Sequence, residues 1–214
     1  MDEELAIIDR NTRNQKIKDF LINNKKLLIS ILLIIVLAVL SFYSFKIYTD
    51  NNREQLSNKY NNAIIQHQNG DKTVVVSEMK AVIETENPSY SPLALYYLLD
   101  NNLIDDKDEI NNLFDILIKN TSLEKEIKSL IIYKKALFNA DTIDESGILK
   151  ILNPIINSDS VWKSHSLYLL AEYFYSKGEK NKSKEFFSQI LNIENANLDI
   201  VKEAQKRLTR DLSE

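Results

Sequence analysis

The longest apolar run in the chain is LLISILLIIVLAVLSFYSF, which extends from Leu27 to Phe45 without a charged residue, glycine or proline. As an α-helix this run is about 28 Å long, close to the roughly 30 Å hydrocarbon thickness of a bilayer. A helix satisfies its backbone hydrogen bonds internally, as the lipid interior requires. The pattern therefore predicts a tail at residues 1–26, a transmembrane helix at residues 27–45 and a domain at residues 46–214.

Two alternative interpretations of this run are a cleaved signal peptide and a buried helix of a soluble core. A signal peptide has a shorter apolar region followed by small residues at a cleavage site, whereas SFYSFKIYTD follows here. A run of nineteen uncharged residues is also long for a core helix. The pattern favours an uncleaved membrane anchor.

Basic residues are unevenly distributed around the run. Six lysines and arginines stand before it, against three in the comparable window after it. Because the side richer in lysine and arginine stays in the cytoplasm, we expect a cytoplasmic N-terminus and an exported domain. Tyr43 and Tyr48 stand where interfacial aromatic side chains are common.

Beyond the run, helical stretches alternate with short breaks. Residues 46–69 contain no glycine or proline, so we expect the membrane helix to continue into the first helix of the domain. Its apolar face repeats at helical spacing through Leu56, Tyr60, Ala63, Ile64 and His67. Gly70 and Asp71 end this helix. The next stretch, TVVVSEMKAVI, has a valine-rich start that suits a strand, but its apolar spacing and the lack of a partner strand favour a helix.

The motif Tyr-x-x-Ala marks the first helix of each helix–break–helix unit. It occurs as Tyr60/Ala63, Tyr133/Ala136 and Tyr168/Ala171, and a fourth copy at Ala94 has Ser91 in the tyrosine position. The four alanines are 31, 42 and 35 residues apart. A helical hairpin of about 34 residues is the period of tetratricopeptide repeats. We therefore expect an all-α fold: one transmembrane helix, then an α-solenoid of about four tetratricopeptide-like hairpins and a C-terminal capping helix.

The first and last units share further positions. Counting from Ala171, Gly178 is seven residues on at the break, Ser183 twelve on and Phe187 sixteen on. The same offsets from Ala63 give Gly70, Val75 and Met79. Glycine at such a break adopts positive φ and lets the chain fold back. The pattern predicts two amphipathic helices packed through small residues on either side of each glycine.

The middle units deviate from this pattern. Asn101 and Asn102 take the place of the glycine after Ala94, and a helix at residues 106–119 follows. After Ala136 we expect a short helix that Pro154 ends. The last stretch predicts a capping helix with one apolar face, formed by Leu198, Ile200, Val201, Ala204 and Leu208.

The composition of the chain limits the classes of function that we expect. The chain has no cysteine, only three glycines and three prolines, and a pI near 5.4, so neither thiol chemistry nor a basic nucleic-acid surface is expected. His67 and His165 are the only histidines, and a metal site would need them close together with a third ligand. The acidic residues at 105–109 lack the glycine and spacing of a calcium loop and suit a helix start. We expect no enzyme activity, cofactor or metal.

The recurring tyrosines have two interpretations. Most of them are explained as packing between repeats. Those in the first helices also stand at the position that lines the concave groove of tetratricopeptide repeats, where aromatic side chains can hold an extended peptide. On that hypothesis the protein-binding groove consists of Tyr60, Ile64, His67, Tyr133, Leu137, His165, Tyr168, Glu172 and Tyr175.

The order of these features resembles one family over nearly the whole chain. The features are DEEL at residues 2–5, the basic run, the anchor, the first helix ending at Gly70-Asp71, LNPIINSDSVW at residues 152–162 and the hairpin LAEYFYSKGEKNKSKEFFSQIL. Together they resemble the YfgM-like proteins, which are single-pass inner-membrane proteins of Gram-negative bacteria with a periplasmic tetratricopeptide-like domain. The chain departs from that family in its middle hairpins, which lack glycine at the break between their helices, and at Ser183, where alanine is usual.

The resemblance implies an ancillary subunit of the Sec translocon. Its implied partners are translocon subunits and a membrane-anchored periplasmic chaperone or prolyl isomerase, with an exported polypeptide as a further ligand. The alternative is a cell-envelope adaptor in division or wall synthesis, since anchored repeat proteins serve there too.

Overall fold

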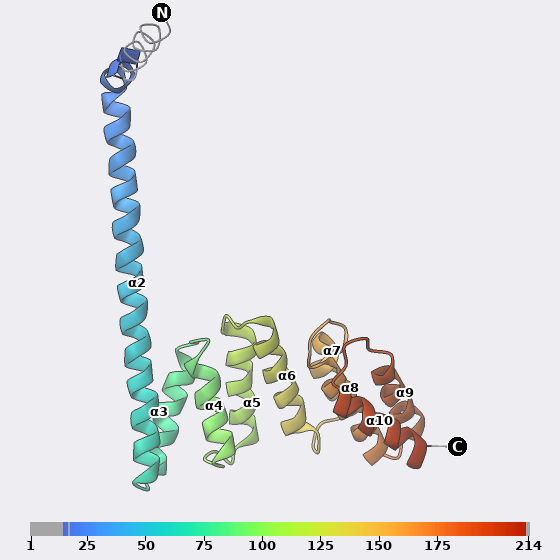
Figure 1. Ribbon diagram of the computed structural model, residues 1–214. Helices are drawn as coiled ribbons and strands as arrows, with labels where there is room; N and C mark the ends of the chain where they lie inside the picture. The colour runs from blue at the N-terminus through green and yellow to red at the C-terminus, as the bar shows by residue number, and fades with distance from the viewer. Residues whose placement is uncertain (1–14, 17, 213–214) are drawn as a thin grey trace, which may run out of the picture. The chain divides into compact units, whose positions relative to one another are not determined.

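The computed structural model describes residues 15–16 and 18–212, and every regular element among them is helical (Figure 1). The all-α prediction is therefore confirmed. The chain divides into two compact units, residues 1–55 and residues 56–214. The DEEL motif and the arginines at positions 10 and 13 lie outside the described residues.

The first unit contains the apolar run. Helix α2 begins at Lys25 and ends at Gln68, so the predicted span continues without a break into the first helix of the domain, as expected. Among the described residues, α2 is the one helix long and apolar enough to cross a membrane. Its apolar side chains between positions 27 and 45 are largely exposed to the surroundings, as lipid-facing side chains of a single span would be.

The second unit is a succession of helices joined by short connecting segments (Figure 1). After the end of α2 come α3 (Lys72–Glu84), α4 (Tyr90–Asp100), α5 (Lys107–Asp115), the π-helical turn η1 (Ile116–Asn120), α6 (Lys125–Asn139), α7 (Glu145–Ile156), α8 (Lys163–Ser176), α9 (Lys180–Leu191) and α10 (Leu198–Arg210). The valine-rich segment lies in α3, so the strand alternative for it is wrong.

Three buried clusters form the core of this unit. The first contains residues of α2, α3, α4, α5, η1 and α6. The second contains residues of α6, α7 and α8, and the third contains residues of α8, α9 and α10. Ala63, Ala94, Ala136 and Ala171 are each no more than 1% exposed. A small side chain at these places lets the neighbouring helices approach closely, as the repeated motif predicts.

The positions twelve and sixteen residues after these alanines are also buried. Val75 and Met79 in α3, and Ser183 and Phe187 in α9, are completely inaccessible. The third helical hairpin has the same arrangement, because Ile148 and Leu152 in α7 are likewise inaccessible. The spacing of buried positions that the sequence suggested for two helical hairpins therefore holds for three of them.

Three first helices end with the same backbone geometry. Gly70, Asn102 and Gly178 have φ values of 91°, 49° and 78°. In each case the next residue donates its backbone N–H to the carbonyl five positions back, as Glu179 does to Phe174 at 2.9 Å. This is the Schellman ending of a helix, which satisfies carbonyls that the last turn leaves open. Asparagine serves at position 102 because it tolerates the left-handed conformation better than other non-glycine residues.

Gly178→Val is expected to destabilise the second unit. A built Cβ at Gly178 meets nothing within 4 Å, so the cost comes from the backbone, where φ is 78°. That cost is about 1–2 kcal/mol for a residue with a Cβ. Thermal melts should show a lower midpoint for Gly178→Val and a smaller decrease for Gly178→Asn. Equal midpoints for the wild type and the valine variant would contradict the left-handed conformation.

The second helices of the first three hairpins begin at an aspartate. The carboxylates of Asp71, Asp106 and Asp144 accept backbone N–H groups of α3, α5 and α7, at distances of 2.8–3.3 Å. Such N-caps satisfy donors that the first turn leaves open. The acidic run near position 106 is therefore a helix start, as the sequence analysis favoured.

Three details differ from the sequence-based prediction. Helix α7 continues through Pro154 to Ile156, so the prediction that this proline ends the helix is wrong. The proline lies in the last turn, where it removes only one backbone donor. The helix predicted at residues 106–119 is α5 followed by η1. Leu198 is 74% exposed and does not share the buried face of α10.

Candidate protein-binding surface

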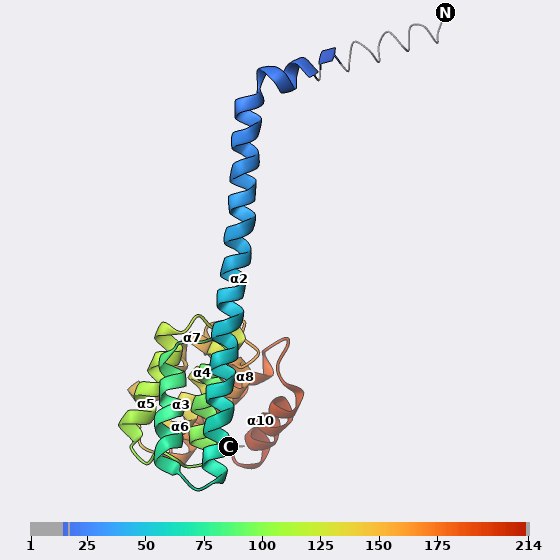
Figure 2. The same cartoon turned by 90° about the vertical axis from the view of Figure 1, so that its left-hand side faces the viewer.

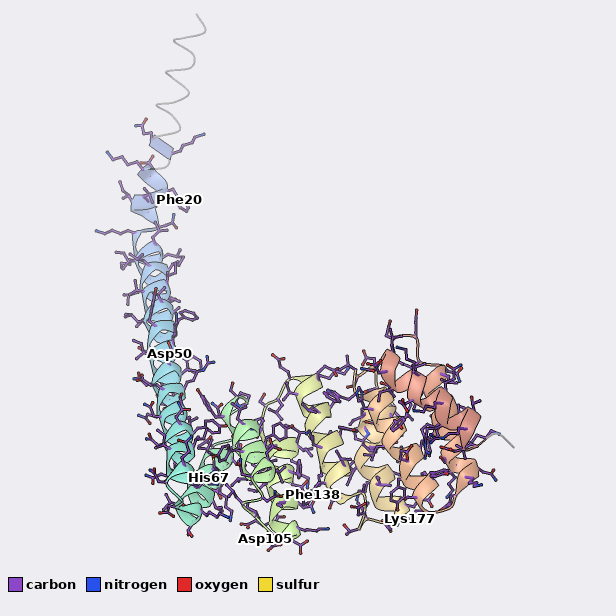
Figure 3. The ribbon with its side chains drawn as sticks, turned by 60° about the horizontal axis from the view of Figure 1, so that its bottom comes forward. Phe20, Asp50, His67, Asp105, Phe138 and Lys177 are labelled. Carbon is purple, nitrogen blue, oxygen red and sulfur yellow. The ribbon has the colours of Figure 1, made fainter. Side chains whose placement is uncertain are left out.

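Eight of the nine predicted groove residues are distributed over three contacts between helices of the second unit, and Leu137 lies elsewhere. The first contact lies between α2 and α4. The Tyr60 ring packs at 6.0 Å from Tyr90 and 6.3 Å from Tyr97, centroid to centroid. His67, labelled in Figure 3, has its Nδ1 atom 2.7 Å from the hydroxyl oxygen of Tyr97. Ile64 packs partly buried against the same cluster. Burial raises the pKa of Tyr60, and the neighbouring Tyr97 adds to that rise.

The second contact lies between α6 and α8. The Tyr133 ring stacks on Trp162 at 5.7 Å and meets His165 edge-on at 6.1 Å. The Nδ1 atom of His165 is buried without a hydrogen bond of normal geometry. Burial lowers the pKa of His165, because the charged imidazolium loses solvent there, and the Val161 carbonyl partly offsets this.

The third contact joins α8 to α10. The guanidinium of Arg207 donates to both carboxylate oxygens of Glu172, at 2.7 and 3.0 Å. The same guanidinium lies 4.3 Å from the centroid of the Tyr175 ring. Beside this contact, Tyr168 of α8 meets Phe187 of α9 edge-on at 5.4 Å. Glu172 therefore serves an ion pair across two helices and is not a free acidic group of a groove.

A hollow lies between α4 and α6, and we name it the Tyr96 cleft. It has two neighbouring parts, of about 600 and about 270 Å³, and the Tyr96 side chain lines both. The larger part is lined mainly by Pro88, Pro92, Leu93, Tyr96, Ile127 and Leu130. The smaller part is lined mainly by Tyr96, Leu99, Phe114, Lys134, Leu137 and Phe138.

The rim of the cleft exposes apolar side chains. Leu93, Ile127 and Leu137 are 47%, 41% and 48% exposed. Leu93 and Ile127 line the larger part and Leu137 lines the smaller part. Each part is the kind of concave, mostly apolar surface that binds a ligand or a protein segment. Of the nine predicted groove residues, Leu137 is the one that lines this cleft.

Tyr96 lines both parts of the cleft. Its hydroxyl is buried and has no hydrogen-bond partner. Burial raises the pKa of Tyr96 to about 12, and the nearby Asp100 carboxylate contributes. Tyr96 therefore remains a neutral phenol at physiological pH, and its buried hydroxyl is an unpaired polar group. The ammonium of Lys134 lies 5.7 Å from the Tyr96 ring centroid.

The sequence analysis missed most of this cleft. The second helical hairpin has Ser91 where the others have tyrosine, so α4 contributed no predicted groove residue. A signal was present in α6, where Ile127, Leu130 and Leu137 form a second apolar stripe beside Lys134. Because Ile131 and Ala136 already supply a buried face, an additional apolar stripe indicates a surface with another purpose.

Among the described residues, no group of three histidine, cysteine, aspartate or glutamate side chains is placed to hold a metal ion. His67 contacts Tyr97 and His165 contacts Tyr133, so the two imidazoles belong to different contacts. The arrangement of the cleft favours binding through apolar contact.

Comparison with known proteins gives no relative for this chain. No protein-family model, curated protein or solved structure matches it.

His165 is expected to make stability depend on pH. Its folded-state pKa is lowered, so the unfolded chain binds a proton more readily below about pH 6.5. Stability is therefore fully present above that pH and decreases as pH falls toward the folded-state value. Melting midpoints measured from pH 7.5 to pH 5.5 should decrease more for the wild type than for His165→Phe. Identical pH profiles for the two proteins would contradict the burial of this imidazole.

Proposed function

We propose that this protein is a membrane-anchored scaffold that binds other proteins. The observation that carries the proposal is the Tyr96 cleft, with three exposed aliphatic side chains on its rim. A bound segment would cover Leu93, Ile127 and Leu137 and remove that apolar area from water. The long apolar helix α2 would hold this surface near a membrane.

The domain would be an α-solenoid of about four tetratricopeptide-like hairpins with α10 as its cap. Support comes from the four buried alanines, the recurring left-handed helix endings and the aspartate caps. In such a solenoid each hairpin packs on its neighbours, and α10 would cover the last one. The Arg207 and Glu172 ion pair would fasten that cap to α8.

The narrower proposal is an ancillary subunit of the Sec translocon, in the manner of the YfgM-like proteins. It rests on the order of sequence features across the chain, from the basic tail and anchor to the last hairpin. Its partners would be translocon subunits and a membrane-anchored periplasmic chaperone or prolyl isomerase, and an exported polypeptide would be a suitable ligand for an apolar cleft. The alternative remains an envelope adaptor in division or wall synthesis.

Mild crosslinking in whole cells followed by affinity purification separates these two functions. We expect translocon subunits together with a chaperone or prolyl isomerase. Recovery of division or wall-synthesis proteins without translocon subunits would favour the adaptor. Recovery of neither group would remove the support for both.

Orientation is expected to be N-terminus inside and domain outside. The reason is the excess of lysine and arginine before the span. Alkaline phosphatase, which is active only after export, should be active when fused after Glu214 and inactive when fused after Lys26. The reverse pattern would overturn the orientation, and with it the periplasmic placement of the Tyr96 cleft.

A further inference from the structure

The short segment before α2 exposes apolar and basic side chains together. Residues 18–23 are helical, and Asn24 is a turn residue between them and α2. Figure 2 shows the ribbon changing direction just before α2. The side-chain amide and the backbone N–H of Asn24 both donate to the Phe20 carbonyl, at 2.9 and 3.0 Å. This segment is therefore a separate short helix joined to the span.

Three apolar side chains of this segment are largely exposed. Phe20, Leu21 and Ile22 are 58%, 50% and 62% exposed. They lie outside the predicted span, which begins at Leu27, so the span does not account for them. Figure 3 shows the side chains around Phe20 projecting outward from the ribbon.

The charge of residues 16–26, which contain this segment and the first two residues of α2, is strongly positive. Lysines stand at positions 16, 18, 25 and 26, against a single acidic residue, Asp19. All four lysine side chains are exposed. Long lysine side chains can lay their methylene groups along an apolar surface while their ammonium groups reach polar headgroups.

We propose that this segment docks on the membrane surface and binds anionic lipid headgroups. The proposal rests on the anchor proposed above. If residues 27–45 span the bilayer, the attached helix is held at the boundary between headgroups and acyl chains. Apolar side chains beside lysines fit that boundary, and clusters of basic residues next to a span attract anionic lipids. The segment then sets the depth of the anchor and enriches anionic lipid around it.

The absence of cysteine allows a direct test with the full chain. A nitroxide label is attached to a single introduced cysteine, Leu21→Cys, and the protein is reconstituted into vesicles of phosphatidylcholine and phosphatidylglycerol. We expect the label to collide with oxygen dissolved in lipid and to be shielded from a water-soluble nickel chelate. Each lysine near an anionic surface favours docking about fivefold. Replacing Lys16, Lys18, Lys25 and Lys26 with glutamine should therefore lower the docking equilibrium by roughly two to three orders of magnitude and bring the label into water.

Three controls separate the possible failures. Pure phosphatidylcholine vesicles should expose the label as the glutamine variant does, whereas equal docking in both lipids would overturn the role of anionic headgroups. Replacing four exposed lysines of the second unit, Lys72, Lys107, Lys150 and Lys180, should leave the docking of the label unchanged.

A label at Ile35→Cys reports whether the span itself lies in lipid. If that label is in lipid while the label at residue 21 is in water, the docking inference is overturned and the anchor stands. If the label at residue 35 is in water, the anchor fails, and the inference fails with it.

Discussion

Replacing Ile34 and Leu37 with arginine is expected to release the protein from the membrane. Both side chains lie near the middle of the apolar run and are exposed on α2. An arginine at the centre of a membrane helix costs about 2.5–3.5 kcal/mol, so the pair costs about 5–7 kcal/mol. Alkaline carbonate extraction should leave the wild type in the membrane pellet and move the variant to the supernatant.

The matched control places two arginines on α2 beyond the run, at Thr49 and Asn52. Both positions are exposed and lie outside the predicted hydrocarbon region. That variant should stay in the pellet, which excludes a general effect of added charge. If the variant with arginine at positions 34 and 37 stayed in the pellet as the wild type does, residues 27–45 would not be the anchor.

Replacing Leu93 and Ile127 with glutamate is expected to abolish partner capture while the domain stays folded. Both side chains are more than two-fifths exposed, so the charges remain solvated in the free protein. A bound apolar segment would have to cover these charges. Truncating one true anchor residue typically costs about 2 kcal/mol or more, and two charged replacements should weaken capture by at least about a hundredfold.

Leu198→Glu is the control for this pair. Leu198 is also an exposed leucine, 74% accessible, but it lies on α10 and does not line the Tyr96 cleft. Circular dichroism should show unchanged helicity for both variants, and partners should be recovered only with Leu198→Glu. Wild-type recovery by the double glutamate variant would place the binding surface elsewhere on the protein.

The sequence predicted those features of the fold that depend on a local pattern of residues. An uninterrupted helical pattern at residues 46–69 predicted the continuation of α2, and a fixed offset from Ala171 predicted the left-handed Gly178. Such features depend on helix period and on the conformational range of single residues, which the sequence displays directly. Pro154 was misjudged because its effect depends on its distance from the end of the helix, and that distance was unknown.

The exposed apolar surface was harder to predict because it depends on which helix faces meet. The sequence placed Glu172 on an open face, but its partner, Arg207, comes from α10, 35 residues away. It likewise placed Tyr133 in a groove, where the structure stacks the ring on Trp162. Helical periodicity predicts that a face is apolar but not which neighbour covers it. The Tyr96 cleft exists because α4 and α6 leave their facing apolar side chains partly uncovered.

Site-specific photocrosslinking tests the central proposal most directly. A photoreactive residue at position 127 of the full-length protein, in its native membrane, should crosslink to translocon subunits, a chaperone or prolyl isomerase, or an exported chain. The crosslinks should disappear when Leu93 is replaced by glutamate and should not form from position 198. Absence of crosslinks from position 127 in a folded, membrane-bound protein, or the same crosslinked proteins from position 198, would contradict a protein-binding role for the Tyr96 cleft.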